Sequence, residues 1–323
     1  MIMMPTTEET GQRLAEIPNL TVSRQTPLAL YTRFGIGGPA DIYAETGSAE
    51  AFVAALAVAR SSGIPTMVIG GGTNLIVSDN GYRGIVLRYR GDRLLSANGR
   101  ISADAGAPLQ GLVDFAIARG LAGLETLSGI PGSVGAAIYG NAGAYGHSIS
   151  ERVVSVRFFD GQSLRIFDRE QCQFQYRESI FKQHKEWMIL GLEVRLTVGD
   201  AAALRSAADE ILKVRNEKFP VTMKCAGSIF KNLLLRELPP GVAELVPASA
   251  VREGKVPAAW FLDQVGAKGM SRGEIHVAAY HANLIYNSGA GTAADLCALI
   301  AELRALVRQR FGLELEEEVQ YVG

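Results

Sequence analysis

The spacing of apolar side chains predicts alternating helices and strands in the first two thirds of the chain. Residues 47–65 place apolar side chains at helical spacing on one face, between a capping serine, Ser48, and a terminating glycine, Gly63. The apolar run 65–70 then predicts a buried strand. By the same reasoning, further strands are predicted at 84–90, 100–106 and 188–198, and helices near 108–119 and 201–216.

Two later segments have especially clear patterns. Alternating apolar and polar residues over 152–168 predict two strands joined by a hairpin turn at 160–161. Residues 293–311 carry an apolar stripe at helical spacing, with Thr292 at the start and Gly312 after the end. Because helices are mixed with many antiparallel strand signals, the sequence predicts an α+β fold.

Composition limits the classes of function. The chain has 323 residues, of which 48% are hydrophobic and 20% charged, as in ordinary globular proteins. A net charge of −1 gives no reason to expect nucleic acid or membrane partners, and no apolar run approaches the roughly 18 residues of a membrane span. Three scattered cysteines fit a reducing compartment, and four histidines form no zinc-type array. We therefore expect a cytoplasmic protein without a metal site, and a monomer.

Two glycine-rich stretches indicate a ligand that approaches the main chain. They are "VIGGGTNLIVSD" at 68–79 and "GLETLSGIPGSVGAAIYGNAGAYG" at 123–146. The patterns GxxxxGK[ST] and GxGxxG both fail at 68–79, and "GIGGPA" at 35–40 fits GxGxxA without an apolar strand before it. Consecutive bare N–H groups can still form a nest for phosphate oxygens. Each stretch alone could be a tight turn, but the two together favour a dinucleotide without a Rossmann fold.

Six motifs occur in an order and spacing similar to one enzyme family: "RFGIGGPADIYAE", "VIGGGTNLIVSD", "GLETLSGIPGSVGAAIYGNAGAYG", "QYRESIFK", "AGSIFKN" and "EEEVQYVG". From about residue 26 onward the chain resembles the UDP-N-acetylenolpyruvoylglucosamine reductases. The resemblance implies an FAD-binding fold of the vanillyl-alcohol-oxidase type, with two α/β subdomains, and a C-terminal α+β domain that binds the UDP-sugar. The implied divisions are a tail with a short helix at 1–25, FAD-binding subdomains at 26–83 and 84–219, and the substrate domain at 220–323.

The resemblance also implies the cofactors and the reaction. FAD would be bound non-covalently, and NADPH would donate the hydride. The substrate would be the enolpyruvyl ether of UDP-N-acetylglucosamine, reduced to UDP-N-acetylmuramate for peptidoglycan synthesis. The residues expected to bind FAD lie in the two glycine-rich stretches: Gly70, Gly71, Gly72, Thr73, Asn74, Gly129, Ile130, Pro131, Gly132, Ser133, Gly135, Ala136, Asn141 and Gly143.

Three catalytic residues follow from the resemblance. Arg177 would hold the substrate carboxylate in its planar guanidinium fork, although without the motif a surface pair with Glu178 is the commoner fate. Ser228 would donate a proton, where an ordinary turn serine is the commoner alternative. In the C-terminal tail, the catalytic glutamate of the family directly precedes a valine, which identifies Glu318. It would lie opposite Arg177, beside the substrate carboxylate, whose like charge raises its pKa. We expect the neighbouring glutamates to be solvated.

Five further residues are expected to bind substrate: Tyr176, Lys231, Asn232, Lys268 and Asn283. Alternatives stay open for three of them. Tyr176 could equally pack, Lys268 could equally be a solvated lysine, and Asn283 could belong to a core strand in which His281 is satisfied internally.

Three departures from the family pattern stand out. The strand near 198 passes directly into the next helix, so this chain resembles the shorter type that lacks a tyrosine-bearing lid loop. Leu233 stands where proline is more usual, and Gln320 where arginine is frequent. Two alternative functions remain: an FAD-linked oxidase of the same fold, which passes electrons to oxygen, and a non-catalytic UDP-sugar-binding flavoprotein.

Overall fold

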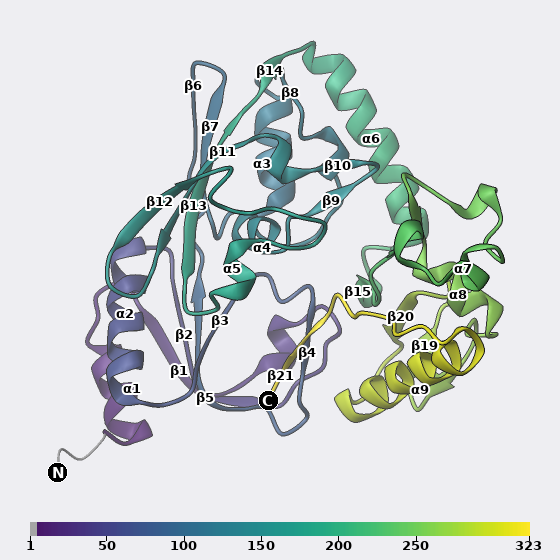
Figure 1. Cartoon of the computed structure of the whole chain (residues 1–323). Helices are drawn as coiled ribbons and strands as arrows, with labels where there is room; N and C mark the ends of the chain where they lie inside the picture. The colour runs from purple at the N-terminus through teal and green to yellow at the C-terminus, as the bar shows by residue number, and fades with distance from the viewer. Residues whose placement is uncertain (1–4) are drawn as a thin grey trace. The chain divides into compact units, whose positions relative to one another are not determined.

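The computed structural model describes residues 5–323, which divide into two compact units (Figure 1). The first unit comprises the chain up to Thr26, Ala40–Gly72 and Tyr82–Glu217, and the second comprises Pro27–Pro39, Thr73–Gly81 and Lys218–Gly323. The second unit therefore starts close to the expected division at 220. It also takes two short segments that the sequence analysis placed in the first FAD-binding subdomain.

The first sheet of the first unit has the strand order β1-β2-β5-β3. Its strands are Thr21–Pro27, Pro39–Thr46, Tyr82–Tyr89 and Thr66–Ile69 respectively. The central strand β5 pairs in parallel with β2 and with β3. Parallel neighbours need a crossover connection, and the helix α2 supplies it between β2 and β3.

Helix α2 (Ala49–Ser62) forms as its sequence predicts. The Ser48 hydroxyl accepts the N–H of Ala51, and Gly63 ends the helix in the left-handed conformation (φ +69°). Its buried side chains include Phe52 and Leu56, which join the core that contains β5. The shorter helix α1 (Thr7–Ala15) contacts α2 and begins with a capping box.

The second sheet of the first unit is antiparallel, with the order β12-β11-β13-β7-β6. Its strands are Leu164–Asp168, Val153–Phe159, Met188–Arg195, Arg100–Asp104 and Leu94–Ala97. The predicted hairpin is confirmed, because the Asp160 carboxylate accepts the N–H groups of Gln162 and Ser163 in the turn between β11 and β12. Helices α3 (Leu109–Ile117) and α4 (Val134–Tyr139) share one apolar core with this sheet.

The short elements of the first unit complete its surface. They are β8 (Leu121–Ala122), β9 (Gly143–Ala144), β10 (His147–Ser148), β14 (Thr197–Val198) and α5 (Ile180–Gln183). The chain passes from β14 directly into helix α6 (Ala201–Lys218), so the predicted absence of a lid insertion is confirmed.

The second unit is built on the antiparallel sheet β15-β20-β19-β18. Its strands are Lys224–Ser228, Leu284–Asn287, Ile275–Val277 and Ser271–Arg272. Around it are β4 (Leu75–Val77), β16 (Leu233–Leu234), β17 (Lys255–Val256), α7 (Pro240–Ala243), α8 (Ala258–Gln264) and β21 (Gln320–Val322).

Helix α9 (Ala293–Phe311) packs against this sheet with the ends predicted from the sequence (Figure 1). The Thr292 hydroxyl caps its first turn, and Gly312 ends it in the left-handed conformation. Its predicted stripe is buried, including Leu299, Leu303 and Val307, and each large apolar side chain buried in this way contributes about 1.5–3 kcal/mol.

His281 differs from one expectation. Its Nδ1 atom is buried and has no hydrogen-bond partner in the part of the chain that the structure describes. Burial lowers the pKa of the imidazole to about 4. The neighbouring strand β20 is in the core as expected, but His281 is not satisfied internally at this atom.

Two further observations concern residues 5–323 as a whole. None of their helices combines the length and the apolar character that crossing a membrane requires. No group of three or more His, Cys, Asp or Glu side chains among them is arranged to hold a metal ion.

Candidate active site

The two glycine-rich stretches lie against each other in the first unit. A Cβ atom built on Gly71 would lie 3.1 Å from the Cα atom of Gly132, and one on Gly70 would lie 2.9 Å from the Ser133 Oγ atom. Any side chain at Gly71 would therefore push the second stretch away. Bare, closely opposed main chain of this kind is what the phosphates of a dinucleotide need, so these residues fit non-covalent FAD.

Other glycines of the second stretch serve packing within the unit. Gly135 donates its N–H to the Ala105 carbonyl oxygen (2.8 Å), and a Cβ atom on Gly143 would lie 2.3 Å from the His147 carbonyl oxygen. Gly129 donates its N–H to the Gln110 side chain (2.7 Å). These contacts explain the glycines without a ligand.

The remaining predicted FAD residues of this stretch divide by exposure. Pro131 and Ala136 are exposed and accessible to a ligand, whereas Ile130 is partly buried and packs on the core. The direct contacts of FAD within the second stretch are therefore assigned most narrowly to Gly132 and the exposed residues beside it.

Arg177 lies in a tight turn, residues 175–178, which we call the arginine turn. Gln175 and Glu178 exchange two N–H···O bonds across it, of 3.0 and 3.1 Å. Arg177 itself has φ +60°, a conformation that costs a non-glycine residue about 1–2 kcal/mol. The surrounding contacts must hold this strained residue in place, as is common at functional sites.

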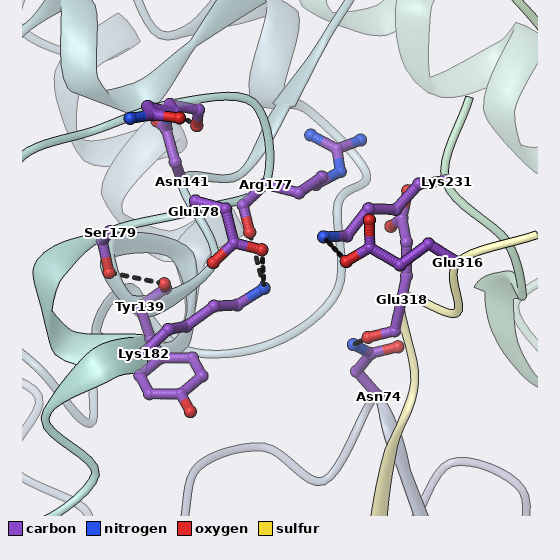
Figure 2. Close-up of polar contacts among 11 residues, drawn as sticks. Asn74, Tyr139, Asn141, Arg177, Glu178, Ser179, Lys182, Lys231, Glu316 and Glu318 are labelled. Atoms are coloured by element: carbon purple, nitrogen blue, oxygen red, sulfur yellow. Dashed lines mark hydrogen bonds and ion pairs between the residues drawn. The ribbon is translucent and has the colours of Figure 1, made fainter. Parts of the chain in front are cut away.

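Four contacts fix the arginine turn to the second glycine-rich stretch and to helix α5. Figure 2 shows them: Asn141 donates to the Gln175 carbonyl oxygen (2.8 Å), Ser179 donates to the Tyr139 carbonyl oxygen (2.7 Å), Arg177 donates to the Gly143 carbonyl oxygen (3.1 Å), and Lys182 pairs with Glu178 (3.2 Å). The Arg177 side chain extends away from the Glu178 carboxylate, while its guanidinium carbon lies 5.2 Å from the ring centre of Tyr176. Asn141, expected to bind FAD, uses its side chain to hold this turn.

Ser228 lies in the second unit, in residues 227–232, which we call the serine loop. The pairing of β15 with β20 is irregular between Cys225 and Ser228, and Gly227 between them has φ +79°. An irregularity of this kind redirects the following side chain. Ser228 is half-buried at the end of the strand.

Asn283 supports the serine loop from below. Its side-chain oxygen accepts the Phe230 N–H (2.9 Å), and its NH₂ group donates to the Phe230 carbonyl oxygen (2.9 Å). Because Asn283 is only 2% exposed, these bonds give it a positioning role beneath the loop rather than a surface for the substrate.

The next residues of the chain are also tied to the protein. The Asn232 side chain accepts the N–H of Ala258 at the start of α8 (3.3 Å). Leu233, which replaces the usual proline, pairs with Val256 in the β16–β17 ladder. This ladder defines the path of the chain after Asn232, which the sequence left open.

Residues 316–318, which we call the glutamate segment, run antiparallel to the serine loop. Lys231 donates its N–H to the Glu316 carbonyl oxygen (2.8 Å), and Glu318 donates its N–H to the Ile229 carbonyl oxygen (2.7 Å). Asn74 adds a second support, because its side chain donates to the Glu318 carbonyl oxygen (2.6 Å; Figure 2) and its carbonyl oxygen accepts the Gln320 N–H (3.0 Å). Asn74 was expected at the FAD site, and its tie to Glu318 was not foreseen.

The glutamates of the tail are not uniformly solvated, which corrects the expectation for Glu316 and Glu317. Glu316 forms an ion pair with the buried Lys231. Glu317 pairs with Arg304 on α9 (3.1 Å) and accepts a hydrogen bond from the Tyr321 hydroxyl; burial and this bond raise the pKa of that hydroxyl.

Lys268 forms an ion pair with Asp263 (2.9 Å), and both side chains are well exposed, at 39% and 46%. Such a surface pair contributes at most about 1 kcal/mol, so a phosphate group could displace the aspartate.

The comparisons with known proteins cover the whole length of these features. Residues 40–164 match the family model described as "FAD binding domain", and residues 219–322 match the one described as "UDP-N-acetylenolpyruvoylglucosamine reductase, C-terminal domain". The first match confirms the prediction of FAD as cofactor.

Relatives of known name agree with both matches. A UDP-N-acetylenolpyruvoylglucosamine reductase of Solibacter usitatus is 68% identical over 311 residues, which span 96% of this chain and all of that protein. The reductase of Rubrobacter xylanophilus is 38% identical, over 92% of this chain and 94% of that one. The crystal structure of the Thermus caldophilus reductase superposes with a TM-score of 0.73 at 27% identity, over 94% of this chain and all of that one.

These matches confirm the fold class, the FAD cofactor and the reductive activity predicted from the motifs, and they do not favour the two alternatives. The chain belongs to the UDP-N-acetylenolpyruvoylglucosamine reductase family, whose FAD- and NADPH-dependent reduction yields a peptidoglycan precursor.

Proposed function

We propose that Arg177, Ser228 and Glu318 act directly on the enolpyruvyl substrate in this reduction. Bound FAD supplies the redox chemistry, by taking a hydride from NADPH and passing it to the terminal carbon of the enolpyruvyl group. The electron pair left on the adjacent carbon is delocalised into the substrate carboxylate. The protein must therefore stabilise that carboxylate and protonate that carbon.

Arg177 binds the carboxylate. A guanidinium offers two parallel N–H donors to the two carboxylate oxygens, and this pairing strengthens as enolate charge develops. The anchored arginine turn supports this role, because a side chain whose backbone is fixed against neighbouring main chain loses little further freedom on binding.

Ser228 donates the proton to the carbon next to the carboxylate. A hydroxyl has a high pKa, so it serves as an acid only when its proton is replaced at once. Lys231, three residues along the serine loop, and a bound water are the candidates for returning it. Glu318 lies beside the substrate carboxylate and, when protonated, stabilises the enolate or feeds a proton.

One observation carries the proposal: the antiparallel pairing of the serine loop with the glutamate segment. This pairing brings Ile229 and Glu318, 89 positions apart in the sequence, into direct backbone contact at 2.7 Å. Asn283 fixes one side of the pair and Asn74 the other. Two motifs with no obvious reason to coincide thus form one supported structure, as acid–base residues require.

The remaining roles follow from the same proposal. Tyr176 orients the substrate, Lys268 and Asn232 bind the UDP-sugar, and Thr73 with Asn74 extends the FAD site of Gly70 and Gly71. We also expect a cytoplasmic monomer that binds no nucleic acid.

Glu318→Gln should lower the rate at which the substrate reoxidises the reduced flavin by about 10- to 100-fold, because an amide keeps the shape but cannot carry or share the proton. Flavin content and reduction by NADPH should stay near wild type. The measurement is anaerobic single-turnover stopped-flow absorbance. The matched control is Glu314→Gln, since Glu314 pairs only with the arginines of α9 among its recorded partners. Equal effects in the two variants would remove Glu318 from the mechanism.

A further inference from the structure

Lys231 is an unusual lysine in this chain. Within residues 5–323 it is the one lysine or arginine in the buried class, and its side chain is 10% exposed. Burial of an ammonium group is unfavourable unless an opposite charge and hydrogen bonds compensate it. The environment of Lys231 must therefore be arranged to keep it charged.

Glu316 provides an opposite charge from the solvent side. Its carboxylate is ion-paired with the Lys231 ammonium, although the Glu316 side chain is 70% exposed (Figure 2). The pair is thus asymmetric. The glutamate gives up little hydration, while the lysine gains the partner that its burial demands.

The backbone fixes this pair in register. The main chains of the same two residues are joined by the bond from the Lys231 N–H to the Glu316 carbonyl oxygen (2.8 Å), and Phe230 forms the next bridge with Glu317. Two residues on, Glu318 is bonded to Ile229. Glu316 and Glu318 are separated by two positions of extended chain and so share one face, and Figure 2 draws both beside Lys231.

The other two glutamates of the tail bind elsewhere. Glu314 pairs with Arg308 (2.9 Å) and Arg304 (3.5 Å), and Glu317 pairs with Arg304. The tail is therefore divided: Glu314 and Glu317 serve helix α9, whereas Glu316 serves the serine loop. This division gives Glu316 a matched internal control.

We propose that Glu316 is a positioning residue, which holds the Lys231 ammonium charged and fixed next to Ser228 and Glu318 during reduction of the anionic substrate. The inference rests on the proposed function of the serine loop and the glutamate segment. Lys231 would direct its remaining N–H donors at the substrate or return the proton that Ser228 gives up, and Glu316 would act only through Lys231.

The first test is the pH profile of substrate-dependent flavin reoxidation in Glu316→Gln, measured in single turnover between pH 6 and 9.5. Without Glu316, burial should lower the pKa of Lys231, so the alkaline limb should move about one pH unit or more toward lower pH. The rate at pH 8.5 should then fall about tenfold, while the rate at pH 6 stays near wild type. Glu314→Gln should leave the profile unmoved. A coincident profile in Glu316→Gln, or the same shift in both variants, would overturn the proposal.

A second variant separates charge from structure. A guanidinium stays protonated throughout this pH range. In a Lys231→Arg background, therefore, adding Glu316→Gln should no longer shift the alkaline limb. A shift that persists in the double variant would show that Glu316 does not act through Lys231.

A direct titration makes the test independent of catalysis. In holoenzyme labelled with ¹³C at lysine Cε, the signal missing from Lys231→Arg identifies Lys231. Its pKa should be at least one unit lower in Glu316→Gln, and in Glu316→Asp, which keeps the charge on a shorter arm, it should lie between the two. An unchanged pKa would overturn the proposal. Failure of the substrate to reoxidise the wild-type flavin would instead overturn the proposed function, and the titration would still report on the pair.

Discussion

Ser228→Ala should separate the two halves of the reaction. Reduction of the flavin by NADPH should be nearly normal, because no substrate proton is involved. Reoxidation by the enolpyruvyl substrate should slow by a factor on the order of 10² to 10⁴, the usual contribution of a positioned acid. Stopped-flow absorbance of the flavin, recorded first with NADPH and then with substrate, measures the two steps separately.

The control for this experiment is Ser271→Ala, which removes the hydroxyl of an exposed serine in the same sheet of the second unit. It should leave both steps unchanged. If Ser228→Ala reoxidises at the wild-type rate, Ser228 is an ordinary turn serine and the proton comes from another group.

Gly71→Val should yield a folded protein that has lost its flavin. The Cβ atom alone would lie 3.1 Å from the Gly132 Cα atom, and the two methyl groups of valine would fill the space between the glycine-rich stretches. Flavin content is measured by absorbance after denaturation, and folding by circular dichroism. Gly47→Val is the matched control in the same unit, because a Cβ atom on Gly47 would meet nothing within 4 Å. Full flavin content in Gly71→Val would mean that the cradle is elsewhere.

Much of the fold could be predicted because its signals are local. The ends of α2 and α9 depend on a capping hydroxyl and a left-handed glycine within the same helix, and both pairs can be read directly from the sequence. The turn between β11 and β12 likewise depends on Asp160 alone. The division into units was harder, because the segments Pro27–Pro39 and Thr73–Gly81 join the second unit through strand pairing and packing that no local pattern reports.

The site could be predicted in part. The motifs identified its residue types, but not which of them support the others. Asn283 carries the same amide whether it faces a ligand or, as in the structure, the main chain of Phe230. Glu316 looks like one of several solvated acids until the antiparallel pairing places it against Lys231. These distinctions depend on contacts between residues more than 50 positions apart, which a single sequence does not specify.

The central claim is that this chain passes electrons from NADPH, through FAD, to an enolpyruvyl ether. Anaerobic titration of the purified wild-type protein tests it most directly. NADPH should bleach the flavin absorbance, and addition of UDP-N-acetylglucosamine enolpyruvate without oxygen should restore it within one turnover, with stoichiometric formation of UDP-N-acetylmuramate. A flavin that stays reduced with the substrate and recovers only when air is admitted would contradict the account and indicate an oxidase instead.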